Sequence, residues 1–211
     1  MDGVLYDSMK NHAYTWVESF RKAGINFPPY DAYLNEGRTG PGTIEIAFRQ
    51  YGKREATEQD IQSIYDYKTQ LMQEAPVAPI LPGMQEIIKT TMNAGLKVMV
   101  VTGSKQPSLI TRLQNDFGIP EGTVVSGFDV KKGKPDPEPY LIALEKTGCR
   151  NEEVIVIENA PMGVKSAVAA GITTIAVNTG ILENQVLADE GAKLVLPGTM
   201  ALLEIWPEII R

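Results

Sequence analysis

Residues 154–163 read Val154-Ile155-Val156-Ile157-Glu158-Asn159-Ala160-Pro161-Met162-Gly163, and this stretch indicates the fold class. Four consecutive β-branched residues are typical of a strand buried on both faces, as strands of parallel sheets are. Pro161 then favours the first turn of a helix. The strand ends in two oxygen-bearing side chains, Glu158 and Asn159, which are hard ligands of the kind that magnesium prefers. Asn159 could alternatively be only the N-cap of the following helix.

Similar β-branched strands lie on both sides of this stretch and alternate with helical segments from Leu81 onward. This alternation predicts an α/β fold with a Rossmann-like parallel sheet and helices on both faces. Ligands of such sheets bind beyond the carboxyl ends of the strands, so we expect the chemistry there. The predicted strands are residues 97–102, 123–126, 154–157, 173–177 and 193–196.

The N-terminal part differs, because every periodic segment from about Ser8 to Pro79 reads as helix. Ser8 and Gly24 are the expected N-cap and stop of the first helix, and Thr57 with Asp60 resembles a capping box. The change in periodicity marks a boundary near residue 80 between an all-helical part and an α/β part.

Composition limits the possible partners. The 211 residues carry a net charge of −6, which argues against a nucleic-acid footprint and against an anionic membrane surface. The lone Cys149 allows no intramolecular disulfide, and the apolar runs are too short to cross a bilayer. We therefore expect a cytoplasmic monomer or weak dimer that binds a small molecule, with no nucleic-acid or membrane partner.

Three further motifs lie where predicted strands end. Asp2-Gly3 places an acid before a glycine turn, and Thr102-Gly103-Ser104 places a hydroxyl and free amides at an expected helix start. Such a helix start can bind an anion, although an ordinary N-cap explains the same residues.

The third motif is Gly133-Lys134-Pro135-Asp136-Pro137-Glu138. Asp136 is accounted for as the cap of a helix whose first residue is Pro137. Capping does not account for Lys134, which could act as a point charge on a phosphate oxygen.

The order of these motifs, acid-glycine, hydroxyl, lysine and acidic pair, resembles the haloacid dehalogenase superfamily, and the resemblance covers nearly the whole chain. The runs Asp-Gly-Val-Leu-x-Asp-Ser and Gly-Lys-Pro-Asp-Pro-Glu-Pro-Tyr, with Ala-Ala-Gly at 169–171, look like its β-phosphoglucomutase-like phosphatases. The resemblance implies a Mg²⁺-dependent phosphohydrolase that acts through an aspartyl-phosphate. It also implies a helical cap inserted after the first motif, so we expect an all-helical cap of residues 9–79 inserted in an α/β core of residues 1–8 and 80–211.

The resemblance also implies a role for each motif residue. Asp2 is the expected general acid and base, with its carbonyl on the metal. Thr102 and the Gly103 amide would hold the phosphoryl group, and Ser104 would also bind substrate. Lys134 would bridge the phosphoryl charge to the nucleophile. The metal would be held by Asp2, Glu158 and Asn159.

Two positions depart from the family pattern. The family's nucleophilic Asp lies two residues before its acid, which here would precede Met1, and the residues before it form the central strand. We therefore expect the natural gene product to begin upstream and the printed chain to lack the usual catalysis. Asn159 stands where the family usually carries a second carboxylate, so weaker metal binding is expected.

Cap residues are expected to select the substrate. The resemblance directs His12 and Lys68 toward the cleft, although a lysine on a helix face more often reaches solvent. In the loop with Glu36, Arg38 and Thr39, a glycine follows Thr39 where a true β-phosphoglucomutase has a phosphate-binding arginine.

This loop resembles branch members that hydrolyse inorganic pyrophosphate, although Glu36 could instead be a solvated loop acid. Pyrophosphate and small phosphate monoesters such as sugar phosphates are therefore the favoured substrates. The alternatives are a phosphosugar mutase, a dehalogenase, or a non-catalytic binding module if Met1 is the true start.

Overall fold

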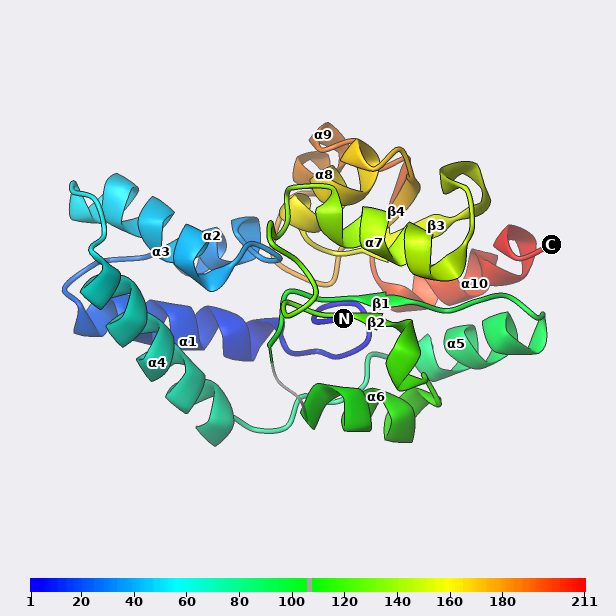
Figure 1. Cartoon of the computed structure of the whole chain (residues 1–211), viewed down its shortest axis with the longest axis horizontal. Helices are drawn as coiled ribbons and strands as arrows, with labels where there is room; N and C mark the ends of the chain where they lie inside the picture. The colour runs from blue at the N-terminus through cyan, green and yellow to red at the C-terminus, as the bar shows by residue number, and fades with distance from the viewer. Residues whose placement is uncertain (106–107) are drawn as a thin grey trace.

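The computed structural model of the chain describes residues 1–105 and 108–211. Helices fill the N-terminal third and form a cap region at one side of the molecule, drawn blue to cyan in Figure 1. These cap elements are α1 (Met9–Lys22), α2 (Pro29–Leu34), α3 (Gly40–Ala47), a π-helical turn (Phe48–Gly52) and α4 (Glu58–Glu74).

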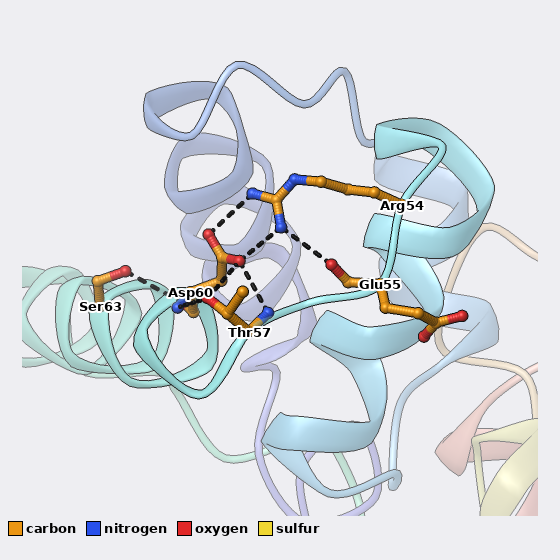
Figure 2. Close-up of polar contacts among 5 residues, drawn as sticks. All are labelled: Arg54, Glu55, Thr57, Asp60 and Ser63. Atoms are coloured by element: carbon orange, nitrogen blue, oxygen red, sulfur yellow. Dashed lines mark hydrogen bonds and ion pairs between the residues drawn. The ribbon is translucent and has the colours of Figure 1, made fainter.

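The start of α4 is fixed by the predicted capping box. The Asp60 amide donates to Thr57 Oγ1 at 3.2 Å, and the Thr57 amide donates to Asp60 Oδ2 at 2.8 Å. Figure 2 shows the Arg54 guanidinium approaching the same carboxylate, with Nη1 2.6 Å from Oδ2 and Nη2 3.0 Å from Oδ1. Two backbone donors of the first turn are thus satisfied within the motif that the sequence indicates.

The remainder of the chain alternates strands and helices, as predicted, and every strand pair is parallel. The described residues form two sheets, with orders β1-β2 and β3-β4-β5, where the sequence suggested one. The elements are α5 (Met84–Asn93), β1 (Val100–Val101), α6 (Ser108–Phe117), β2 (Val124–Val125), α7 (Glu138–Thr147), β3 (Ile155–Glu158), α8 (Pro161–Ala169), β4 (Thr173–Val177), α9 (Asn184–Asp189), β5 (Leu194–Leu196) and α10 (Thr199–Ile209), with short 3₁₀ turns at Glu121–Thr123 and Asn151–Glu153.

The largest hydrophobic cluster of the described residues contains side chains from both sheets. Val100 and Val124 from the smaller sheet share it with Ile175 and Val177 from the larger one. Burial of this apolar surface stabilises the α/β core as one body. The cap helices pack around a second cluster that includes Trp16 and Phe20.

The start and the end of the helical region lie side by side. The Asp7 amide donates to the Pro79 carbonyl at 2.9 Å, and the Leu81 amide donates to the Leu5 carbonyl at 2.9 Å. Tyr6 and Ile80 form an antiparallel bridge between these two hydrogen bonds. Both connections between core and cap therefore run through one short paired segment.

The helix starts near Ser8, Asp136 and Asn159 differ in part from the sequence interpretation. Ser8 is the N-cap residue of α1 as expected, but its hydroxyl donates to Asp2 Oδ1 at 2.6 Å and caps no amide of the helix. Helix α7 begins one residue later than predicted, and Asp136 Oδ1 accepts the Glu138 amide at 3.0 Å. Ala160, not Asn159, is the N-cap of α8. The Ser8 hydroxyl is thus taken by Asp2, whereas Asp136 still accepts an amide at the start of α7.

The segment after β1 also differs from expectation. Helix α6 begins at Ser108, so Thr102 and Gly103 do not form a helix N-terminus, and the intervening residues 106–107 lie outside the described part. No helix within the described residues has the length and apolar character needed to cross a bilayer.

Candidate active site at the carboxyl ends of the strands

Glu158 and Lys134 form a buried ion pair at the end of β3. Lys134 Nζ lies 2.5 Å from Glu158 Oε1, and both side chains are 6% exposed. Lys134 Nζ also donates to the Val101 carbonyl at 3.3 Å, at the end of β1. The pair therefore bridges the ends of the two sheets. Ligand binding was predicted at these carboxyl ends of the strands.

Both oxygens of the Glu158 carboxylate accept hydrogen bonds. Tyr140 donates its hydroxyl to Oε1 at 2.7 Å, and Oε2 accepts the amides of Asn159 at 3.0 Å and Ala160 at 3.4 Å. Burial alone would raise the pKa of Glu158, but the Lys134 charge, the Met1 α-amino group and the hydrogen bonds from Lys134 and Tyr140 lower it to about 2. Glu158 is thus anionic at neutral pH despite its burial.

Asp2 forms a second charged centre near the turn at Gly3. Its Oδ1 accepts the Ser8 hydroxyl at 2.6 Å and lies 3.4 Å from His12 Nε2. Burial acts to raise the pKa of Asp2, yet His12 and the Met1 α-amino group hold that pKa well below its usual value. Asp2 is a charged acceptor here with an imidazole within reach of a proton transfer.

His12 also connects Asp2 to the cap residue Lys68. Lys68 Nζ lies 3.4 Å from His12 Nδ1 and 5.3 Å from the centre of the Trp16 ring. Burial lowers the pKa of Lys68, while the charges of Glu36 and Asp2 oppose this. Lys68 thus points toward the site and not into solvent, and Glu36 lies near enough to act on its charge.

The cap loop that carries Glu36 and Arg38 lies against the core. Arg38 pairs with the backbone of Lys134 in a parallel bridge, and its Nη2 approaches Met162 Sδ at 3.0 Å. Arg38 is half-buried, and this burial lowers the pKa of its guanidinium. Thr39 is used locally, because its Oγ1 accepts the Gly42 amide as the N-cap of α3.

The predicted anion-binding residues at the end of β1 are arranged differently. Thr102 is buried, and its Oγ1 accepts the amide of Ser104 at 3.2 Å. The Ser104 amide is therefore engaged by the Thr102 hydroxyl, whereas Gly103 is exposed beside the carbonyl of Gly37 in the cap loop. The structure brings Thr102 and Gly103 to the site.

The residues expected to hold Mg²⁺ supply oxygen donors. Glu158 and Asn159 are buried, and Asn159 packs so closely on Gly3 that a Cβ there would overlap its amide group. No cluster of three or more His, Cys, Asp or Glu side chains suited to a metal occurs among the described residues. The two carboxylates of Asp2 and Glu158 together with a carboxamide fit Mg²⁺ in donor chemistry, and both carboxylates lie near enough to the Met1 α-amino group to act on its charge.

Sequence reasoning missed two contacts of this site. Tyr140 lies in a motif run that the sequence did single out, but no local pattern indicates that its hydroxyl reaches Glu158. The Ser8 hydroxyl was expected at a helix cap and instead binds Asp2. Both contacts depend on how distant or adjoining elements pack, which residue spacing does not specify.

Comparison with known proteins identifies relatives over nearly the full length. The model of the haloacid dehalogenase-like hydrolase family matches residues 1–177. A phosphorylated carbohydrates phosphatase of Thermotoga maritima is 27% identical over 97% of this chain and 91% of its own length. Hexitol phosphatase A of Escherichia coli is 29% identical over 84% of this chain and 80% of its own.

A solved structure from Bacteroides vulgatus, provisionally named a beta-phosphoglucomutase, is similar in both sequence and fold. It is 45% identical, with a TM-score of 0.93 over 98% of this chain and 85% of the other. The structure of CbbY from Rhodobacter sphaeroides in complex with phosphate has a TM-score of 0.72 at 22% identity, which supports the fold alone.

Proposed function

We infer the function from the family: the chain belongs to the haloacid dehalogenase-like hydrolases, in their β-phosphoglucomutase-like branch. We propose that it acts in the Mg²⁺-dependent hydrolysis of a small phosphate compound. The observation that carries this proposal is the buried Lys134–Glu158 pair, which gathers a cation and an oxygen ligand at the strand ends where Asp2 also lies.

In this proposal the chain's own residues position a phosphoryl group and balance its charge. Lys134 would place its ammonium on a phosphoryl oxygen, and Thr102 with the Gly103 amide would hold the others. Asp2 would carry the proton of the attacking or leaving oxygen, oriented by His12 and Ser8. Bound Mg²⁺, held by Asp2, Glu158 and Asn159, would neutralise phosphate charge.

The helical cap would close this site from above. We propose that residues 9–79 form the cap and that residues 1–8 and 80–211 form the core. Glu36, Arg38 and Lys68 would then face the leaving group, which is the part of the substrate that separates from the phosphoryl group. This division is supported by the separate hydrophobic clusters of the two regions.

The substrate class follows from two lines of support. The names of the Thermotoga and Escherichia relatives favour a phosphorylated carbohydrate. The carboxylate of Glu36 beside Lys68 supports pyrophosphate as the second candidate, because a carboxylate facing an anionic ligand requires a cation or hydroxyl between them. Arg38 and Thr39 offer no distal phosphate clamp of the mutase kind, so hydrolysis is favoured over phosphosugar mutation.

The test is phosphate release from sugar phosphates, hexitol phosphates and pyrophosphate in the presence of Mg²⁺. It is run on the 211-residue chain and on a version extended by an apolar strand ending in Asp directly before Met1. Activity in the extended protein and not in the shorter one supports an Asp nucleophile at that position. If neither protein releases phosphate from any compound, the hydrolase proposal fails, and a binding module that keeps the fold is favoured.

A further inference from the structure

The segment that follows β4, residues 178–183, contacts both the cap and the turn that carries Asp2. The Thr179 hydroxyl donates to the Gly3 carbonyl at 2.5 Å, next to Asp2. From the other end of the segment Glu183 accepts a hydrogen bond from the Tyr30 hydroxyl on α2. One short segment thus contacts both helix α2 and the turn that carries Asp2.

Leu182 is the apolar member of this segment, and it packs with the cap and not with the core. It is 6% exposed and belongs to the hydrophobic cluster formed by the cap helices. Val186, in α9, packs against the same cluster. The cap cluster is therefore completed by side chains that the core supplies.

Gly180 marks the closest approach between the segment and α2. A Cβ at Gly180 would lie 2.8 Å from Tyr33 Cδ1 and 3.0 Å from Cε1, and Tyr33 is 8% exposed. A Cβ contact of 2.8 Å essentially does not occur, so a larger residue at position 180 requires the Tyr33 ring, and α2 with it, to shift. Because Gly180 has no side chain, the Tyr33 ring can pack directly against the backbone.

The position of α2 determines where the cap loop with Glu36 and Arg38 lies. Helix α2 ends at Leu34, and Glu36 and Arg38 follow directly. Arg38 is then joined to the backbone of Lys134. A shift of α2 away from Gly180 would therefore move Glu36 and Arg38 away from the ion pair at the strand ends.

We propose that residues 178–183 are a platform that seats α2 and so positions Glu36 and Arg38 over the phosphate site. Gly180 and Leu182 are its positioning residues, and Thr179 ties the platform to the turn that carries Asp2. The proposal rests on the proposed function only for the identity of the ligand. The seating of the cap itself can be measured without one.

The experiment compares Gly180→Ala with Gly122→Ala, because a Cβ at Gly122 meets no atom within 4 Å. Cap seating is measured by small-angle X-ray scattering of the full chain without ligand. Binding of pyrophosphate and of a hexose phosphate with Mg²⁺ is measured by calorimetry. We expect Gly180→Ala to increase the radius of gyration and to weaken binding at least tenfold, and Gly122→Ala to change neither.

A compensating variant separates a displaced cap from general damage. Tyr33→Leu removes the ring that the new Cβ would meet, so Gly180→Ala with Tyr33→Leu should recover the compact scattering profile. Leu182→Ala, compared with the half-exposed Leu141→Ala, tests the same seating without added volume. The platform is refuted if Gly180→Ala and Leu182→Ala both scatter like the unaltered chain. If the unaltered chain binds neither phosphate compound, the proposed function fails, while scattering still decides the platform.

Discussion

Replacing Glu158 by Gln should destabilise the protein strongly, because Lys134 would keep a charge with no counter-charge. Both side chains are 6% exposed. Apart from Glu158, the Lys134 ammonium hydrogen-bonds among the described residues only to the Val101 carbonyl at 3.3 Å, and it lies 5.0 Å from the centre of the Tyr140 ring. Removing one member of a buried pair costs about 3–5 kcal/mol. The depressed pKa of Glu158, about 2 against an ordinary 4.5, corresponds to a similar amount, roughly 3 kcal/mol.

The opposite change, Lys134→Met, should cost less. Glu158 would still accept from the Tyr140 hydroxyl and from the amides of Asn159 and Ala160. A carboxylate with three donors remains better satisfied than an ammonium with one carbonyl. The larger loss of stability expected for Glu158→Gln than for Lys134→Met therefore follows from the hydrogen bonds around the pair.

Urea unfolding followed by circular dichroism measures both effects. With a slope of about 2 kcal/mol per M, a loss of about 4 kcal/mol lowers the midpoint by about 2 M. Glu55→Gln is the matched control, since Glu55 pairs with Arg49 at an exposed position, and its midpoint should not change. A midpoint shift below about 0.5 M for Glu158→Gln, or a larger shift for Lys134→Met, would refute the reasoning.

Four further outcomes are expected. Because the folded pKa of Glu158 lies below its unfolded value, its contribution to the free energy of unfolding is fully present above about pH 4.5 and is lost as the pH falls toward 2. The urea midpoint of the unaltered chain should therefore fall over that window, and the midpoint of Glu158→Gln should fall less. Thr57→Ala should cost about 1 kcal/mol through loss of the α4 cap, seen as a lower thermal midpoint, and an unchanged midpoint would contradict the capping box. Gly163→Ala should cost about 1–3 kcal/mol because its Cβ would overlap the Glu158 carboxyl group, whereas Gly122→Ala should be neutral in the same urea titration. Chelation of Mg²⁺ should abolish any phosphate release, and release that persists in excess EDTA would exclude the proposed metal role.

Much of the fold could be predicted because local patterns determine it. Residues 173–177 form a strand as predicted, and the Thr57–Asp60 capping box starts α4 where the sequence placed it. The predicted strand at residues 97–102 is shorter, Val100–Val101, because a strand extends only as far as its partner pairs with it. Register and partner length are properties of the assembled sheet and not of one segment.

The site was predictable in its residue types and less so in its contacts. Strand-end polarity identified Glu158, and an unexplained lysine between Gly and Pro identified Lys134, and these two do meet. From its position on a helical face, the Lys68 side chain could point to solvent or into the cleft. The structure places it against His12. The Tyr140 contact and the place of Leu182 in the cap cluster could not be predicted, since both depend on packing between distant segments.

The paired segment that joins the cap to the core has a consequence for how such a protein can change. Asp7 and Pro79 are held together by a hydrogen bond, so the helical region between them begins and ends at the same place. A chain that ran directly from one to the other would need only a tight turn, and the order of the core strands would not change. A cap of different length or shape could therefore be exchanged at this junction, altering the molecule that is recognised while the residues at the strand ends stay where they are.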